Sequence, residues 1–155
     1  MKDTNWKDIA ELVGVAAIVA SLIFVGLQMR QSHEIALADQ YQSRSEAVQD
    51  LYISMYEAGY SMRDGLNVPL VDQEPRQRDG TIAMVLWQWT QYDNHHYQYS
   101  AGYLENDAWV GLSKRVQSLY DKCDRRRIWE DYKYGMRSSF IDYVDSLEDR
   151  CPGLE

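Results

Sequence analysis

The sequence of 155 residues contains few prolines, glycines and cysteines. Three prolines and nine glycines allow long uninterrupted helices, because these two residue types are the strongest helix breakers. The two cysteines, Cys123 and Cys151, are too few for a disulfide framework or a zinc signature, and we expect free, partly buried thiols. A single disulfide between them remains an alternative if this part of the chain faces an oxidising compartment.

Basic residues are outnumbered by acidic ones, 16 against 24, which gives a formal net charge of −8. This balance argues against nucleic acid as a partner, because binding to phosphates needs an excess of Lys and Arg. A hydrophobic content of 45% argues against disorder. Twelve tyrosines and five tryptophans predict large, partly polar packing surfaces.

Sequence motifs of catalysis are also missing. The chain has no glycine-rich phosphate-binding loop and no nucleophile elbow, and its Asp, His and Ser residues do not form a triad-like pattern. We therefore expect no enzymatic activity and no cofactor, and the sequence does not by itself identify a function.

The most distinctive stretch present is Leu12 to Leu27, which has no charged side chain and only one polar side chain, Ser21. Extended to residues 9–29, it is about twenty residues long, enough for a hydrocarbon core of roughly 30 Å. Trp6 before the stretch and Arg30 after it are predicted interfacial anchors. We interpret residues 1–30 as a tail and a transmembrane helix. A cleaved signal peptide and a buried helix of a soluble protein remain as alternatives.

Small residues recur along the stretch. Gly14, Ala17 and Ser21 lie three and four residues apart, so they share one helix face and would let a second helix approach closely in lipid. The expected partners are the lipid bilayer and either a second copy of the chain or a larger membrane complex. Basic residues flank both ends in equal number, which leaves the orientation nearly undecided. Because the leading segment is acidic, we expect a cytoplasmic C-terminal domain.

The rest of the chain, residues 31–155, shows apolar residues at alternating steps of three and four. This spacing predicts helices at about 31–63, 80–102, 107–122 and 126–149, with a loop at 67–79. No window alternates as a strand would. We expect an all-α fold in which the transmembrane helix continues without a break into the first of these helices and packs with an antiparallel helical bundle.

One pair of residues has the spacing of a ligand set. Asp93 and His96 are three residues apart, so one helix face can present a carboxylate and an imidazole together. They are weak candidates for a metal site, because bundle metal sites use several such pairs and this chain has one. The alternative is a core histidine, since His96 also occupies an apolar seam position. The basic run Arg125 to Arg127 fits either anionic lipid headgroups or a solvated helix corner.

Several motifs occur together in this order: Trp6, then ELVGVAAIVASLIFVGLQMRQS, then DNHHYQYSAGYLENDAW, then SSFIDYVDSL. With them the chain resembles a group of small bacterial single-pass membrane proteins that have a helical, Tyr/Trp-rich C-terminal domain. The resemblance implies a single membrane helix followed by a helical domain, and it transfers no functional residue. We expect a bacterial inner-membrane location.

The resulting hypothesis is a non-enzymatic, membrane-anchored scaffold or accessory subunit. An oligomeric pore formed by the first helix is one alternative, and a metal- or ligand-binding sensor is another.

Overall fold

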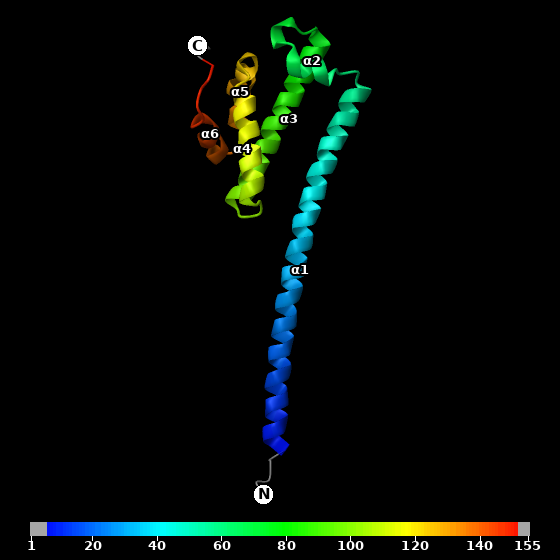
Figure 1. Ribbon diagram of the computed structural model, residues 1–155, viewed down its shortest axis with the longest axis vertical. Coiled ribbons are helices and arrows are strands. Elements are labelled where there is room, and N and C mark those ends of the chain that lie inside the picture. Colours follow the sequence, from blue (N-terminus) through cyan, green and yellow to red (C-terminus); the bar gives the residue numbers. More distant parts are fainter. Residues whose placement is uncertain (1–5, 152–155) are drawn as a thin grey trace. The chain divides into compact units, whose positions relative to one another are not determined.

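A computed structural model describes residues 6–151 of the chain (Figure 1). Within these residues the secondary structure consists of six α-helices and three short 3₁₀ helices, without a strand. The all-α prediction is confirmed. The chain divides into two compact units, residues 1–50 and 51–155. The division predicted at residue 30 was placed at the end of the apolar stretch. That residue 30 marks a membrane boundary stays a prediction. The predicted N-terminal tail, residues 1–5, lies outside the described residues.

Helix α1 runs from Trp6 to Glu57 without interruption. Residues 30–37 contain neither proline nor glycine, so nothing there ends the helix, and the predicted continuity past the apolar stretch is confirmed. The helix ends earlier than the predicted residue 63. Gly59 adopts a φ of 72°, and the Tyr60 N–H donates to the carbonyl of Met55, which is the Schellman arrangement that closes a helix.

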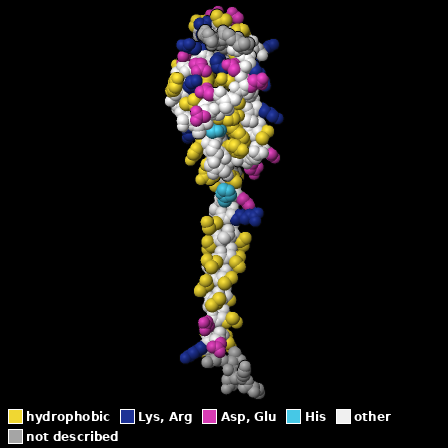
Figure 2. Space-filling view, turned by 90° about the vertical axis from the view of Figure 1, so that its left-hand side faces the viewer, with side chains coloured by type: hydrophobic (Ala, Val, Ile, Leu, Met, Phe, Trp, Pro, Cys, Tyr) yellow, Lys and Arg dark blue, Asp and Glu magenta, His cyan; other side chains and the backbone are white. Residues whose placement is uncertain are grey.

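The apolar stretch of α1 is exposed throughout. By length and composition this helix can cross a membrane, and none of its most apolar window is buried. Figure 2 shows hydrophobic side chains along this part of the helix, with charged side chains at its two ends.

The second unit begins within the last turns of α1, and after a glycine turn at residues 58–60 it consists of short helices around one long one. Its elements are α2 (Met62–Asn67), η1 (Leu70–Asp72), α3 (Pro75–Ser100), α4 (Asn106–Tyr120), η2 (Cys123–Arg125), α5 (Arg126–Tyr132), η3 (Lys133–Gly135) and α6 (Ser138–Asp145).

Two of these boundaries correct the expectations from sequence. Helix α3 begins at Pro75, inside the predicted loop, because proline at the first helical position has the right φ and lacks an N–H that would have no partner there. The helix predicted over 126–149 is divided into α5 and α6, because Met136 is extended after η3. Helix α3 ends where expected, before Gly102, whose φ is 78°.

The core of this unit lies around α3. Val85 and Trp89 on α3 are buried against α4, α5 and α6, and Figure 1 shows α4 running beside α3. The Trp89 ring lies 4.5 Å from that of Trp129, centroid to centroid, and 6.3 Å from that of Phe140. Trp89, Trp129 and Phe140 therefore form one contiguous aromatic core. The buried members from the other helices are Val116, Leu119, Tyr120, Ile128, Trp129, Phe140 and Val144.

Candidate functional site

The predicted membrane-helix residues all lie on the exposed surface of α1. At Gly14, a Cβ atom would meet no atom within 4 Å, so nothing in the described chain covers this position. Trp6, the predicted anchor at the start, is 78% exposed. Arg30, the predicted anchor at the end, pairs with Glu34 one turn further on, at 3.2 Å, which holds its charge away from the apolar stretch. Ala17 and Ser21 are exposed like Gly14.

Asp93 and His96 lie one turn apart on α3, and each is occupied by other contacts. The Asp93 carboxylate is buried and accepts a hydrogen bond of 2.8 Å from Arg137, whose guanidinium also lies over the Tyr97 ring. This ion pair ties the start of α6 to α3. Among residues 6–151, no third His, Cys, Asp or Glu joins the pair in a group able to hold a metal ion.

The His96 imidazole is part of the aromatic core. Its ring stacks on Tyr143 with centroids 5.3 Å apart and contacts Trp109 at 5.4 Å. Burial lowers the pKa of His96 because it removes water from the charged imidazolium, and the nearby Asp93 carboxylate only partly opposes this shift. These ring contacts agree with the interpretation of His96 as a core histidine.

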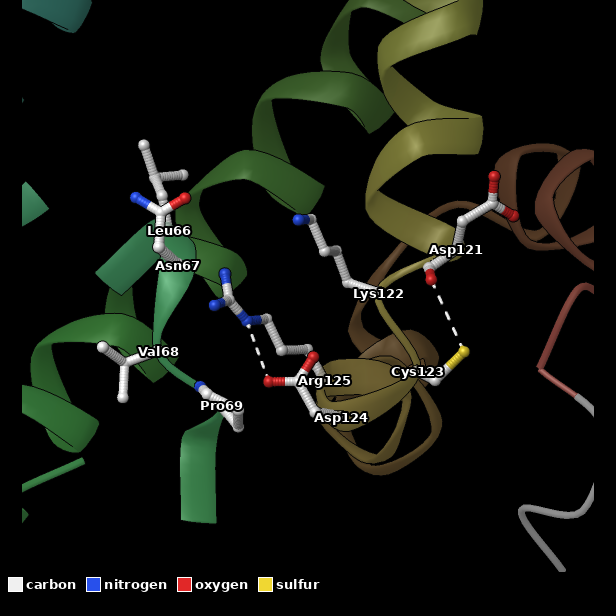
Figure 3. A pocket seen from close by; sticks show the side chains of 9 residues that line it. All are labelled: Leu66, Asn67, Val68, Pro69, Asp121, Lys122, Cys123, Asp124 and Arg125. Atoms are coloured by element: carbon white, nitrogen blue, oxygen red, sulfur yellow. Dashed lines mark hydrogen bonds and ion pairs between the residues drawn. The ribbon is translucent and has the colours of Figure 1, made fainter. Parts of the chain in front are cut away.

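A pocket of about 290 Å³ opens where the segment after α2 meets the corner between α4 and α5 (Figure 3). Two basic side chains reach into it from that corner. Lys122 is exposed, whereas Arg125 is 4% exposed and has an ion pair of 3.5 Å with Asp124. Asp124 also accepts a hydrogen bond of 3.0 Å from the Leu70 N–H, which holds η1 against the corner. The full lining is Leu66, Asn67, Val68, Pro69, Asp121, Lys122, Cys123, Asp124 and Arg125.

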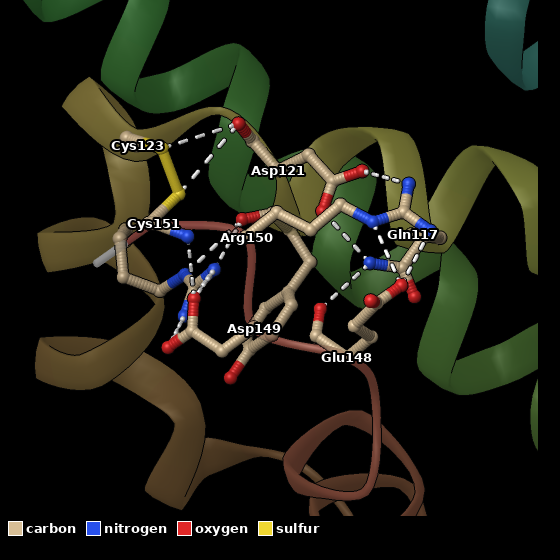
Figure 4. Close-up of polar contacts among 9 residues, drawn as sticks. Gln117, Asp121, Cys123, Glu148, Asp149, Arg150 and Cys151 are labelled. Atoms are coloured by element: carbon tan, nitrogen blue, oxygen red, sulfur yellow. Dashed lines mark hydrogen bonds and ion pairs between the residues drawn. A yellow bond between two sulfur atoms is a disulfide. The ribbon is translucent and has the colours of Figure 1, made fainter.

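Cys123 and Cys151 form a disulfide, with Cα atoms 5.4 Å apart, and the expectation of free thiols is wrong (Figure 4). The helix predicted at about 107–122 would run up to the residue before Cys123, but α4 ends at Tyr120. The chain then turns, so Cys123 faces the C-terminal segment instead. The spacing of 28 residues gave no sign of this contact, because only the fold of α5 and α6 returns the chain to the corner.

Polar contacts reinforce the disulfide on the same side of the domain (Figure 4). Arg126 is buried, lies over the Tyr120 ring, and donates to the Tyr120 carbonyl at 2.6 and 3.1 Å. It also binds both carboxylate oxygens of Asp149, each at 3.2 Å. The Cys151 N–H and then Arg126 lower the pKa of Asp149, since both stabilise its charged form. We call the residues Tyr120, Cys123, Arg126, Asp149 and Cys151 the C-terminal clamp.

The basic run of the sequence therefore has three different environments. Arg125 lines the pocket, Arg126 belongs to the C-terminal clamp, and Arg127 is 84% exposed and pairs with Asp131 on its own helix at 2.9 Å. Sequence reasoning identified the run but could not distinguish its members. The short helix η2 turns the chain between α4 and α5, and this turn decides that Arg125 and Arg126 are buried whereas Arg127 is exposed.

Comparison with known proteins found no relative of this chain. No protein-family model matches the chain, and neither the curated proteins nor the solved structures give a significant match.

Proposed function

We propose that this chain is a membrane-anchored helical scaffold or accessory subunit of the bacterial inner membrane. One observation carries the proposal: the apolar stretch of α1 is fully exposed, and the same helix continues to Glu57 without a break. An exposed apolar surface of this length in water would be a strong aggregation liability, and a bilayer removes that cost. Residues 31–155 would then be held at the membrane surface as a binding domain.

In this proposal the anchored domain is an antiparallel helical bundle built on α3. Residues 101–105 form a short turn between α3 and α4, and α5 and α6 pack on α3 as well. Its interior is filled by tryptophan, phenylalanine and valine side chains, and the described residues hold no group of metal ligands. Such a core supports a rigid binding module better than a catalytic site.

Self-association would use the face formed by Gly14, Ala17 and Ser21. In lipid, close backbone approach and van der Waals packing drive helix association, and small residues permit both. Val19 lies on the opposite side of the helix, so it offers a matched control position.

A photo-crosslinking amino acid placed at residue 17 or at residue 19 of the full chain, in native membranes, tests this arrangement. We expect adducts with a second copy or with one larger partner from residue 17, and only lipid adducts from residue 19. Equal yields from the two positions would contradict the proposed face. Extraction of the wild-type protein by alkaline carbonate would contradict the anchor itself.

The disulfide supports an orientation opposite to the one expected from the acidic leading segment. Disulfides persist in oxidising compartments and are rare in the cytosol, so a Cys123–Cys151 bond favours an extracytoplasmic domain. The balance of flanking basic residues does not oppose this orientation, because it is nearly even. We therefore propose that α1 crosses the membrane with residues 51–155 on the oxidising side.

Digestion by a membrane-impermeant protease in spheroplasts tests the orientation. We expect the protease to digest the C-terminal domain without added detergent. In a separate thiol-labelling experiment, after free thiols are blocked, we expect the two cysteines to become labelled only after reduction. Protection of the domain in intact spheroplasts would overturn this orientation, while leaving the anchor in place.

A further inference from the structure

Two cationic side chains, Lys122 and Arg125, line the pocket beside the corner between α4 and α5. Arg125 is 4% exposed, its buried Nε atom has no hydrogen-bond partner among residues 6–151, and the ion pair of this atom with Asp124 is 3.5 Å long. Buried donors in native structures nearly always have partners, and an exception points to a bound ion or water. Arg125 is therefore a buried cation with one ion pair and with an Nε donor that has no hydrogen-bond acceptor in the described residues.

A second cation lies beside it. The Lys122 side chain extends from the same corner toward the segment of Leu66 to Pro69, as Figure 3 shows, and the Arg125 guanidinium extends in that direction as well. In the described part of the chain, no ion pair or hydrogen bond involves the ammonium group of Lys122, although its backbone N–H donates to the Leu119 carbonyl. Two cationic groups thus extend toward one cavity, and the Asp124 carboxylate pairs with only one of them, Arg125.

The two carboxylates in the lining are already engaged. Asp121 accepts from Gln117 at 2.7 Å and pairs with Arg150 at 3.2 Å. Asp124 accepts from the Leu70 N–H and pairs with Arg125. Because these acids have partners and the two bases have unused donors, the pocket favours an anion over a cation.

We propose that this pocket binds a phosphate group, held by Lys122 and by the terminal nitrogens of Arg125. Guanidinium and ammonium groups form charge-assisted hydrogen bonds with phosphate, and a phosphate has enough oxygens to accept from both. A volume of about 290 Å³ is at the small end of ligand pockets, which suits a single phosphate group and its waters. The phosphate group belongs either to a free anion or to a lipid headgroup.

The test follows the backbone amide signals of Lys122 and Arg125 by NMR, with the full chain in micelles of an uncharged detergent. Sodium phosphate is titrated against sodium chloride at equal ionic strength, so that general screening is the same in both series. We expect saturable shifts with phosphate and none with chloride. Shifts that do not saturate, or that chloride reproduces, would overturn the proposal.

Lys122→Gln is the main variant, because this exposed side chain can be changed without disturbing the core. Removal of one charge-assisted hydrogen bond weakens binding by about tenfold. The matched control is Arg127→Gln, which removes the same charge from an arginine that pairs with Asp131 and does not line the pocket. Equal affinities of these two variants would overturn the proposal. Arg125→Gln, in protein that keeps its wild-type NMR dispersion, should abolish saturation.

The two sources of the phosphate group are distinguished in the same micelles. Phosphatidylglycerol or phosphatidylcholine is added in place of the salt. If the source is a lipid headgroup, phosphatidylglycerol moves the two signals at lower concentration than sodium phosphate does, and Lys122→Gln reduces the effect. If the source is a free anion, sodium phosphate acts and neither lipid does. Failure of all three probes to move the signals would refute the phosphate site.

Discussion

The ring of Tyr60 lies against Gly80 so closely that a Cβ atom at residue 80 would be only 2.5 Å from the Tyr60 Cδ2 atom. The Tyr60 hydroxyl is 3.0 Å from the Thr81 hydroxyl, which holds the ring in this position. A Cβ atom at Gly65 on α2 would also collide with the Tyr60 hydroxyl. One tyrosine thus packs between two glycines and joins α2 to the first turns of α3.

Replacement of Gly80 by alanine should destabilise the domain, although alanine is the better helix former. In an ordinary helix, Gly→Ala gains up to about 1 kcal/mol. Here the added methyl group must displace a ring whose hydroxyl is hydrogen-bonded, and overpacking of this kind costs about 1–3 kcal/mol. Urea denaturation followed by near-ultraviolet circular dichroism measures the change in the free energy of unfolding.

The matched control for this prediction is Gly111→Ala on α4. No atom lies within 4 Å of a Cβ built at Gly111, so this variant should be about 0.5–1 kcal/mol more stable than the wild type. A gain in stability from both substitutions would contradict the packing described for Tyr60.

Loss of the disulfide should lower stability without changing the fold. The bond closes a segment of 28 residues, and its removal in the double variant Cys123→Ser, Cys151→Ser is expected to cost about 2–4 kcal/mol. Reduced wild-type protein should unfold at the same urea concentration as the double variant. If oxidised and reduced wild-type proteins unfold together, the two cysteines are not bonded in the folded protein.

Of the three consecutive arginines, Arg126 should be the one whose substitution lowers the free energy of unfolding most. Arg126→Gln removes hydrogen bonds to the Tyr120 carbonyl and to Asp149, and it leaves that carbonyl without its donor. Hydrogen bonds of charged groups contribute about 1.5–3 kcal/mol, and we expect a loss in that range. Arg127→Gln should change the free energy of unfolding by less than about 0.5 kcal/mol, because that pair is exposed. Equal losses would contradict the C-terminal clamp.

His96 should make stability depend on pH below about 6.5, its ordinary pKa. Because burial lowers this pKa in the folded protein, the unfolded chain binds a proton first as the pH falls, which favours unfolding. The stability contributed by neutral His96 is therefore complete above pH 6.5 and declines as the pH drops toward the lowered pKa. Denaturation midpoints from pH 8 to pH 5 measure this slope.

His96→Phe keeps an aromatic ring in the core and should flatten the same profile. The control is His33→Phe, at an exposed position on α1, which should leave the slope as in the wild type. An unchanged slope in His96→Phe would show that other groups cause the pH dependence.

The sequence by itself determined the elements whose causes are local. The uncharged stretch from Leu12 to Leu27 and the absence of breakers after it determined one long helix, because helix formation depends on neighbours three and four residues apart. The same spacing predicted a helix at about 80–102, and α3 covers this range up to Ser100, shortly before Gly102. These features do not require knowledge of distant residues.

Only the tertiary structure decided which distant residues meet. Cys123 and Cys151 pair because the turn after α4 and the return of the chain after α6 bring them together, and their spacing does not encode this. The same return separates the buried Arg126 from the exposed Arg127, which are neighbours in a uniform basic run. The pocket at Arg125 likewise exists because η1 packs on η2, more than fifty residues later in the chain. Contacts of this kind depend on how helices pack in three dimensions, and a one-dimensional pattern has no information about that packing.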